Sequence, residues 1–338
     1  MQLKDTAQTK LRNYKMAILL VIGGTGFFGK SILEVFGSGG LDEWDIEKVI
    51  VVSRNADKLR YEAPQLITQK IELLSLDITS ARELPLADFV IHAAASTDAR
   101  NYLRQPLQEG NNILDGITNY CRLAKIYHRN SHIIFASSGA VYGQQPGAIE
   151  TIGENYVINP LGDVAPGKEE YTRTKRIAED QIRNLGLAGL SVSIARCFAF
   201  IGPWLPRDQH FAIGNFIADG LAARPIQVQA THRVYRSYLF ADDLVRWLMS
   251  IAQHSSRCCP IYNVGSDQSI LMGDLAKRIA DYFGVAANIG ELRSELVDRY
   301  VPAITKIRDD LGCSVRYDLS SAIGRTAHRI MEIRSLHA

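Results

Sequence analysis

The chain has 338 residues, of which 46% are hydrophobic and 22% charged, a composition typical of one large globular domain or two closely joined ones. Its 38 basic and 36 acidic side chains leave a net charge of +2, so neither nucleic acid nor a membrane surface is predicted as a partner. No apolar run reaches the roughly 18 residues that a membrane-spanning helix needs, and we therefore expect a cytoplasmic protein.

The five cysteines are predicted to be buried reduced thiols. Their number is odd, and their spacing matches neither a metal site nor a Cys-x-x-Cys redox pair, so no metal is expected. Residues 1–15 are polar and basic. We interpret them as a flexible N-terminal extension, with Met16 as an alternative start of the protein.

From residue 17 the chain alternates short apolar runs with amphipathic segments. The apolar runs are rich in valine and isoleucine and predict buried strands at Ala17–Ile22, Lys48–Val52, Ile71–Leu76, Phe89–Ala93, His132–Ala136 and Ser191–Ala195. Apolar residues at helical spacing predict helices at Gly29–Phe36, Ile113–Tyr127 and Tyr171–Leu185. This alternation indicates right-handed crossovers, so the predicted fold class is α/β with a Rossmann-type doubly wound parallel sheet.

The pattern changes after Pro203, where a smaller α/β C-terminal lobe is predicted. Helices are expected at His210–Ala222, Asp242–Ala252, Leu271–Phe283 and Tyr317–Ile333, and strands at Ile226–Val228 and Ile261–Val264. We assign residues 16–203 to the main domain, with 233–265 returning to it. The smaller lobe then comprises 204–232 and 266–338.

A glycine-rich turn follows the first predicted strand. Gly23, Gly26 and Gly29 have the spacing of a dinucleotide-binding turn between a buried strand and an apolar helix. Glycines there allow a tight turn and a close approach of the backbone to a pyrophosphate, whose charge the helix N-terminus attracts. The turn therefore predicts a nicotinamide dinucleotide site.

The end of the second predicted strand indicates which dinucleotide is preferred. Ser53 stands where enzymes selecting NAD usually carry a carboxylate, and Arg54, which suits a 2′-phosphate, follows it. NADP(H) is therefore favoured, with NAD(H) as the alternative if Arg54 is only a solvated surface residue. Asp77 ends the third strand, where it either accepts a hydrogen bond from the adenine amino group or caps a helix.

Tyr171 and Lys175 are four residues apart and therefore neighbours on one face of a predicted helix. An adjacent ammonium group favours the phenolate and lowers the tyrosine pKa from its ordinary value of about 10. Such a pair suits general acid/base catalysis. The spacing alone is common on solvated helices, so the assignment depends on the rest of the chain.

Taken together, these residues resemble the extended short-chain dehydrogenase/reductases, in particular the NAD(P)-dependent nucleotide-sugar epimerase/dehydratase group. The resemblance covers nearly all of residues 17–330. Its motifs are Gly23-x-x-Gly26-x-x-Gly29, Val90–Ala95, Asn112, Ser137–Gly143, Tyr171-x-x-x-Lys175, Arg196, Gly202-Pro203, Arg236–Tyr238 with Asp242-Asp243, and Tyr262–Gly265.

The resemblance implies a role for each matching residue. Ser138 would hold the reacting sugar oxygen, Tyr171 would act on its proton, and Lys175 would lower the tyrosine pKa and bind the nicotinamide ribose. The implied cofactor-binding residues are Gly23, Thr25, Gly26, Phe27, Phe28, Gly29, Ser53, Arg54, Asp77, Ile78, Ala93, Ala94, Ala95, Asn112 and Lys175. The main domain would thus bind the cofactor.

A nucleotide sugar is the substrate that the resemblance implies. The residues expected to bind it are Ser138, Tyr171, Asn215, Arg236 and Arg299. Arg236 would grip the diphosphate, a task that suits the guanidinium fork, or alternatively pair with Asp242 or Asp243. A homodimer formed through the helices at 113–127 and 171–185 is also implied.

Two departures from the family pattern bear on the reaction. Members that dehydrate or decarboxylate the sugar carry acidic residues between the serine and the Val-Tyr-Gly motif, but this chain has Gly139 and Ala140 there. These side chains neither accept nor donate a proton, so a 4,6-dehydratase is not expected. A family asparagine that reaches the substrate is Ala199 here, and Asn215 is a candidate to replace part of its role.

The leading hypothesis is an NADP-dependent reduction of a nucleotide-activated 4-keto-6-deoxy sugar, with hydride transfer at C4 and Tyr171 as the acid/base. The alternative is a nucleotide-sugar 4-epimerase with tightly bound NAD. A non-catalytic NADP-binding protein is the third hypothesis, and the presence of Ser138, Tyr171 and Lys175 together argues against it. The nucleotide base and the sugar are not predicted.

Overall fold

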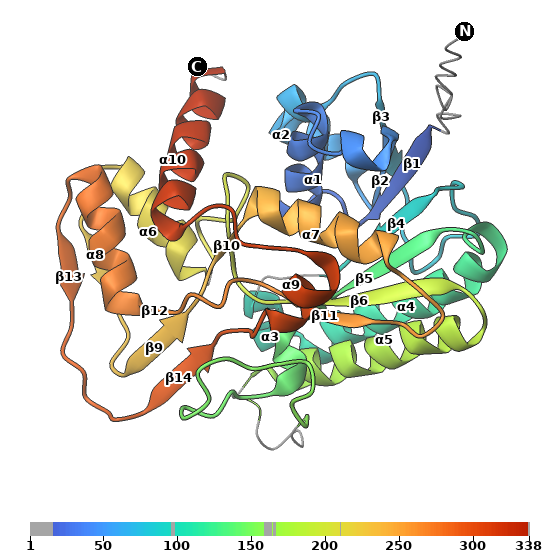
Figure 1. Ribbon diagram of the computed structural model, residues 1–338. Helices are drawn as coiled ribbons and strands as arrows, with labels where there is room; N and C mark the ends of the chain where they lie inside the picture. The colour runs from blue at the N-terminus through green and yellow to red at the C-terminus, as the bar shows by residue number, and fades with distance from the viewer. Residues whose placement is uncertain (1–15, 96–98, 159–163, 165–166, 210, 337–338) are drawn as a thin grey trace, which may run out of the picture.

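A seven-stranded parallel sheet forms the centre of the computed structural model, which describes residues 16–95, 99–158, 164, 167–209 and 211–336 (Figure 1). The strand order is β11-β6-β5-β4-β1-β2-β3. The strands are β1 (Ala17–Ile22), β2 (Ile46–Ser53), β3 (Ile71–Ser75), β4 (Phe89–His92), β5 (His132–Ser138), β6 (Ser191–Cys197) and β11 (Ile261–Val264). The predicted doubly wound parallel sheet is confirmed.

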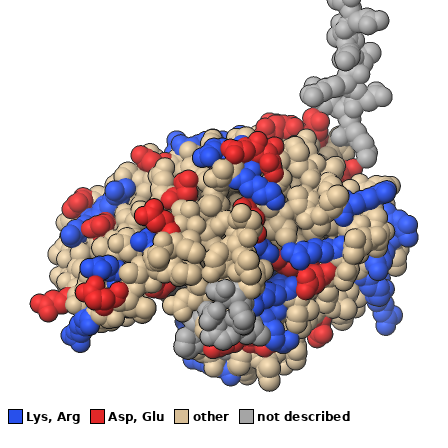
Figure 2. All heavy atoms as spheres, turned by 60° about the horizontal axis from the view of Figure 1, so that its bottom comes forward, with Lys and Arg blue, Asp and Glu red and all other residues tan. Residues whose placement is uncertain are grey.

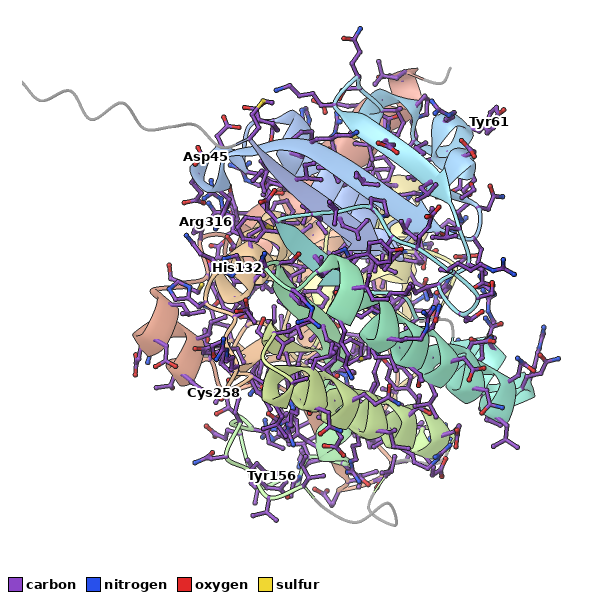
Figure 3. All side chains as sticks on the ribbon, turned by 90° about the vertical axis from the view of Figure 1, so that its right-hand side faces the viewer. Asp45, Tyr61, His132, Tyr156, Cys258 and Arg316 are labelled. Atoms are coloured by element: carbon purple, nitrogen blue, oxygen red, sulfur yellow. The ribbon has the colours of Figure 1, made fainter. Side chains whose placement is uncertain are left out.

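The central strands are apolar on both faces because helices cover both. In β1, Leu19 and Val21 face one core, whereas Leu20 and Ile22 face the other, and all four are at most 1% exposed. Helices α1 (Phe27–Gly37) and α7 (Ala241–Gln253) cover the first face. Helices α4 (Pro106–Tyr127) and α5 (Glu169–Leu187) cover the second, where they lie side by side (Figure 3).

The direction of winding reverses at β1, which pairs with β2 on one side and with β4 on the other. In open parallel sheets, ligands bind beyond the carboxyl ends of the strands at such a switch point. The register aligns Ile22 with His92, and His92 with Phe135 of β5, so these strand ends form one edge. The fold therefore predicts a ligand-binding site at the loops that follow β1, β4 and β5.

A smaller lobe with its own core lies beside this edge, on the left in Figure 1. Its main sheet has β9 (Arg233–Arg236) between β12 (Ile270–Leu271) and β14 (Val297–Tyr300). The other paired strands are β7 (Phe200–Ile201) with β10 (Leu239–Phe240), and β8 (Ile226–Val228) with β13 (Ala287–Ile289). The lobe's helices are α6 (Ala212–Leu221), α8 (Met272–Phe283) and α10 (Leu319–Leu336). Within the segment 233–265, β11 joins the main sheet, whereas β9 pairs with β12 and β14.

Several elements differ from the sequence prediction. Helix α4 begins at Pro106 rather than Ile113, because proline is well suited to the first helical turn and the added residues are mostly exposed and polar. Helix α6 begins at Ala212, and the predicted start at His210 lies outside the described residues. The short elements α2 (Leu59–Glu62), α3 (Ala99–Arg104) and α9 (Thr305–Leu311) were not predicted. The described residues also contain the 3-10 turns η1 (Asp42–Trp44), η2 (Ala56–Lys58), η3 (Pro64–Leu66) and η4 (Gly139–Tyr142).

Acidic and basic side chains are interspersed over the face shown in Figure 2, as the nearly balanced composition predicts. Within the described part of the chain, no helix has the length and apolar character needed to cross a membrane. The cysteines of that part are free thiols, but Cys258 is exposed rather than buried as expected.

Candidate active site

The glycine turn between β1 and α1 packs against the end of β4. Gly23 has a φ of +90°, and a Cβ atom there would lie 2.6 Å from the main chain of Ala94, so this position requires glycine. A Cβ atom at Gly29 would lie 1.9 Å from the carbonyl oxygen of Gly24. Ala93 continues the pairing of the strand ends by donating its N–H to Ile22 at 2.8 Å.

The same turn has room for a pyrophosphate. Gly26 is exposed at the N-cap of α1, and no atom lies within 4 Å of the position that its Cβ would take. The first turn of α1 contains no acidic side chain. Because the free N–H groups of a helix N-terminus attract anions, the residues present fit a dinucleotide. Thr25, Phe27 and Phe28 belong to this turn and to the start of α1.

Hydroxyl groups meet at the end of β2. The hydroxyl oxygens of Thr25 and Ser53 are 3.1 Å apart, and Arg54 follows as an exposed side chain. Asp77 instead stabilises its own turn, because its Oδ1 accepts hydrogen bonds from the N–H and the hydroxyl of Thr79. Ile78 is buried after it.

The remaining predicted cofactor residues occupy two places. Ala94 and Ala95 follow Ala93 in the loop after β4, beside the glycine turn. Asn112 lies on α4, where its Oδ1 accepts a hydrogen bond from Gln108 of the same helix at 3.1 Å. The structure thus places the alanines at the dinucleotide turn and shows Asn112 engaged along its own helix.

Three hydroxyl groups gather at the end of β5. Ser138 Oγ accepts a hydrogen bond from the N–H of Ala140 at 3.2 Å and is hydrogen-bonded to the phenol of Tyr171. The hydroxyl of Tyr300, from β14 in the other lobe, lies 3.3 Å from Ser138 Oγ and donates to the carbonyl of Cys197. This contact could not be expected from the sequence, because nothing in the sequence pattern indicates that β14 reaches this edge.

Burial sets the protonation of the Tyr171–Lys175 pair. Lys175 Nζ donates to the carbonyl of Ala136 at 2.9 Å and lies 5.9 Å from the centre of the Tyr171 ring. Burial lowers the pKa of Lys175 to about 8 and raises the pKa of Tyr171 to about 12, although the bond to Ser138 opposes the latter shift. The pKa of Tyr171 is therefore raised rather than lowered as expected from the sequence, because burial dominates and only the bond to Ser138 opposes it.

The neighbouring hydroxyl, that of Ser137, is not part of the hydroxyl cluster at the end of β5. Its hydroxyl donates to the carboxylate of Glu179 at 2.6 Å, inside the protein. Arg196 on β6 binds the same carboxylate with two hydrogen bonds of 3.0 and 2.7 Å, and its guanidinium lies 4.7 Å from the centre of the Tyr142 ring. Glu179 and Arg196 are each 2% exposed. This buried pair joins the helix of Tyr171 and Lys175 to β5 and β6.

Sequence reasoning missed Glu179. The available signal was its position four residues after Lys175, which puts both side chains on one face of α5. Glu179 thereby differs from Glu169 and Asp180 of the same helix, which are exposed.

The predicted substrate residues of the smaller lobe lie on β9, β14 and α6. Arg236 Nη2 is 2.7 Å from Asp298 Oδ2, so pairing with Asp242 or Asp243 is wrong; Asp243 instead pairs with Arg316. Arg299 donates to the carbonyl of Gly147 at 2.9 Å, and its guanidinium lies 4.2 Å from the centre of the Tyr235 ring. Asn215 donates to the carbonyl of Gln209 at 2.8 Å. Among these side chains, Arg236 is near the hydroxyl cluster, since its charge acts on the Tyr300 phenol.

The model of the NAD dependent epimerase/dehydratase family matches residues 19–265. The chain belongs to this family, and it is an enzyme. It is 24% identical to UDP-glucuronic acid decarboxylase 1 of Arabidopsis thaliana. The alignment of 314 residues covers 91% of this chain and 68% of that protein.

Solved structures show the same fold. UDP-glucose 4-epimerase from Thermotoga maritima, determined with UDP-glucose, has a TM-score of 0.74 and 18% identity, over 94% of this chain and 99% of that one. The dTDP-glucose 4,6-dehydratase from Streptomyces venezuelae, determined with NAD bound, has a TM-score of 0.76 and 20% identity, over 94% and 98% of the two chains.

Within this epimerase/dehydratase chain, Gly139 is enclosed by an aromatic ring. A Cβ atom at Gly139 would lie 2.7 Å from Cζ of Phe198 and 2.8 Å from two further ring atoms. The ring of Phe198 also packs 4.6 Å from that of Tyr300, centre to centre. The space that an acidic side chain at 139 would need is therefore filled.

Gly139→Ala is expected to lower the free energy of unfolding by about 1–3 kcal/mol, because the ring of Phe198 must move to admit the methyl group. Urea unfolding followed by circular dichroism measures this. The matched control is Gly37→Ala near the end of α1, where the new methyl group meets no atom within 4 Å. Equal stability of the two variants would contradict the packing argument.

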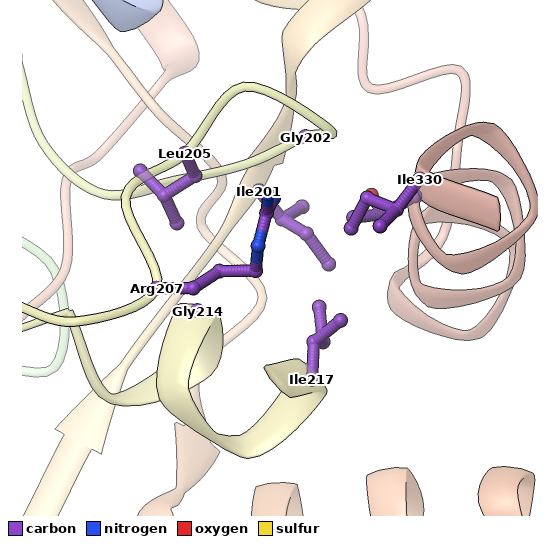
Figure 4. A pocket seen from close by; sticks show the side chains of 8 residues that line it. Ile201, Gly202, Leu205, Arg207, Gly214, Ile217 and Ile330 are labelled. Carbon is purple, nitrogen blue, oxygen red and sulfur yellow. The ribbon is translucent and has the colours of Figure 1, made fainter. Parts of the chain in front are cut away.

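A separate small pocket lies between α6, α10 and the loop after β7 (Figure 4). Its volume is about 170 Å³, including space open to solvent, and it is lined by Ile201, Gly202, Leu205, Arg207, Gly214, Ile217, Thr326 and Ile330. Ligand pockets usually measure about 300–1,000 Å³. This pocket is therefore too small for a dinucleotide or a nucleotide sugar. The candidate active site is instead the group of residues at the carboxyl ends of β1, β4 and β5.

Proposed function

We propose that this enzyme reduces the 4-keto group of a nucleotide-activated 4-keto-6-deoxy sugar with NADPH. The observation that carries the proposal is the hydrogen bond of the Tyr171 phenol to Ser138, beside positions 139 and 140 that hold no acid. Reduction of a ketone needs one proton donor and no further acid/base group. A nucleotide sugar is supported by the named relatives, which act on UDP- and dTDP-linked sugars.

In the proposed reaction, the bound nicotinamide supplies a hydride to C4. Ser138 holds the carbonyl oxygen by a hydrogen bond, so that the oxygen lies next to the Tyr171 phenol. As the electron pair of the C=O bond moves to oxygen, Tyr171 gives its proton to that oxygen, and the ketone becomes a secondary alcohol. Lys175 keeps a positive charge near the phenolate that Tyr171 leaves behind.

Elimination and decarboxylation are not proposed, although relatives carry those names. Gly139 and Ala140 offer no carboxylate, and Phe198 fills the space beside Gly139. A 4-epimerase with tightly held NAD shares the Ser138, Tyr171 and Lys175 arrangement and stays the second candidate.

The test is a screen of UDP-, dTDP-, GDP- and CDP-linked 4-keto-6-deoxy sugars, in which the absorbance of NADPH reports each reaction. One NADPH oxidised for each sugar reduced supports the reductase. Release of NAD on denaturation, with interconversion of 4-epimers and no net oxidation of NADPH, would replace it by the epimerase. Turnover of neither kind would remove the proposal.

We propose NADP(H) as the cofactor because Thr25, Ser53 and Arg54 present hydroxyl and guanidinium donors at the end of β2. Such donors suit a 2′-phosphate. Arg54→Asp is therefore expected to raise the KM for NADPH by about 10- to 100-fold, while the KM for NADH stays unchanged or falls. The control is Arg60→Asp on α2, which changes the net charge equally. If both variants changed the KM equally, Arg54 would act only through the net charge of the surface and would not contact the 2′-phosphate.

The rate is expected to fall as the pH rises through about 8. Burial holds the pKa of Lys175 at about 8, so its ammonium group loses its charge above that pH. Tyr171, with a pKa of about 12, stays protonated in the same range. The kcat profile of the wild type is compared with that of Lys175→Arg, which keeps its charge. A falling limb near pH 8 in both proteins would show that another group causes it.

We further propose that the main sheet with α1 binds the cofactor, that the smaller lobe binds the nucleotide sugar, and that α4 and α5 form a homodimer interface. The pairing of α4 and α5 on one face of the sheet supports the last point (Figure 3). Sedimentation of the purified chain tests it, since a monomer at micromolar concentration would contradict it.

A further inference from the structure

Strand β14 contributes a carboxylate to the anion-binding side of the proposed site. Asp298 Oδ2 lies 2.7 Å from Arg236 Nη2. Arg236 Nη1 donates to the carbonyls of Tyr235 and Asp298, at 2.8 and 3.3 Å. The guanidinium is therefore held in place by main-chain oxygens, while its charge is neutralised by one side chain.

A second cation stands beside this pair. Lys168 is the N-cap residue of α5, three residues before Tyr171. Desolvation and the nearby Arg236 guanidinium lower the pKa of Lys168, and the Asp298 carboxylate opposes that shift. Lys168 therefore lies within electrostatic reach of both members of the pair.

The same strand places a hydroxyl on the catalytic serine. Residues 298 and 300 point to the same side of β14, because side chains alternate along a strand. Tyr300 reaches Ser138, and Asp298 reaches Arg236. Ser138, which would hold the sugar oxygen, and Arg236, which the family resemblance assigns to the diphosphate, therefore both have partners on one face of β14.

We propose that Asp298 occupies the anion position of the substrate site, and that the diphosphate of a nucleotide sugar displaces it from Arg236. This inference rests on the proposed function. Arg236 and Asp298 are 20% and 34% exposed, so a ligand can reach the pair and solvent already weakens it. A diphosphate offers more acceptor oxygens and more charge than a carboxylate, and it engages the guanidinium fork more strongly.

Displacement gives Asp298 a role in specificity. A ligand must carry enough negative charge at this point to compete with a carboxylate that is always present. Lys168 lies within electrostatic reach of the released carboxylate.

The test is Asp298→Asn in the full chain, which removes the charge and keeps the shape. Binding of UDP and dTDP to protein saturated with NADPH is measured by isothermal titration calorimetry at low salt. We expect Asp298→Asn to tighten binding of the preferred nucleoside diphosphate by about 5-fold. The KM of the nucleotide sugar should fall similarly.

The matched control is Glu295→Gln, which removes an equal charge from an exposed pair with Arg233 near the same two strands. It should leave binding unchanged. Unchanged or weaker binding in Asp298→Asn, checked with Asp298→Ser in case the asparagine distorts β14, would overturn the inference while leaving the proposed function in place. If the wild type binds neither diphosphate, both the inference and the nucleotide-sugar assignment fail.

Discussion

Tyr171→Phe is expected to lower kcat by about 10²- to 10⁴-fold, the loss typical of removing a positioned proton donor. The ring remains, so its packing beside Ser138 and its distance from Lys175 are preserved and the KM for the substrate should change little. Steady-state kinetics with the reductase substrate measures both constants. Thermal unfolding of the variant checks that the fold is intact.

Tyr300→Phe is the control, because the Tyr300 hydroxyl also lies 3.3 Å from Ser138 Oγ. Losing it removes one neutral hydrogen bond, and we expect kcat to fall by no more than about 10-fold. The pair of variants identifies the proton donor among two phenols at one serine. A larger loss in Tyr300→Phe than in Tyr171→Phe would transfer the role to Tyr300.

Glu179→Ala is expected to lower the free energy of unfolding by about 3–5 kcal/mol. The change leaves the guanidinium of Arg196 buried without its carboxylate and also removes the acceptor of the Ser137 hydroxyl. Desolvation of an unpaired charge is the main cost. Urea or thermal unfolding of the purified variant measures the loss.

Asp180→Asn provides the comparison on the same helix. Asp180 pairs with Arg183 at 3.4 Å, but its side chain is 70% exposed, so its loss should change stability by less than about 0.5 kcal/mol. If Glu179→Ala were no more damaging than Asp180→Asn, the buried pair would contribute nothing to holding α5 against the sheet.

The main sheet could be predicted because its strands are covered on both faces and so form continuous apolar runs. Strand β1 is the clearest example, with both alternating sets of side chains in a core. In the smaller lobe the short apolar run at Ile226–Val228 predicted strand β8, but its other strands offered no such signal. Strand β12 has two residues, and β9 is Arg-Val-Tyr-Arg, whose polar ends give no pattern that distinguishes a strand from a loop.

The two sides of the site differ for a similar reason. The glycine turn could be predicted because local backbone geometry requires Gly23 and Gly29 at fixed spacing. Contacts between distant residues could not be read in this way. Asp298 meets Arg236 across 62 positions, and Tyr300 meets Ser138 across 162. Both contacts depend on where β14 pairs in the smaller sheet, which the sequence pattern does not determine.

The ring of Phe198 against Gly139 has a consequence for how this protein can evolve. Position 139 is one of the two places where an acid of the family pattern could stand, but an acid there collides with Phe198 unless that side chain becomes smaller. A smaller residue at 198 alone opens a cavity beside Tyr142 and Tyr300 and costs stability. Each single substitution is therefore disfavoured, and an acid at 139 requires both changes together.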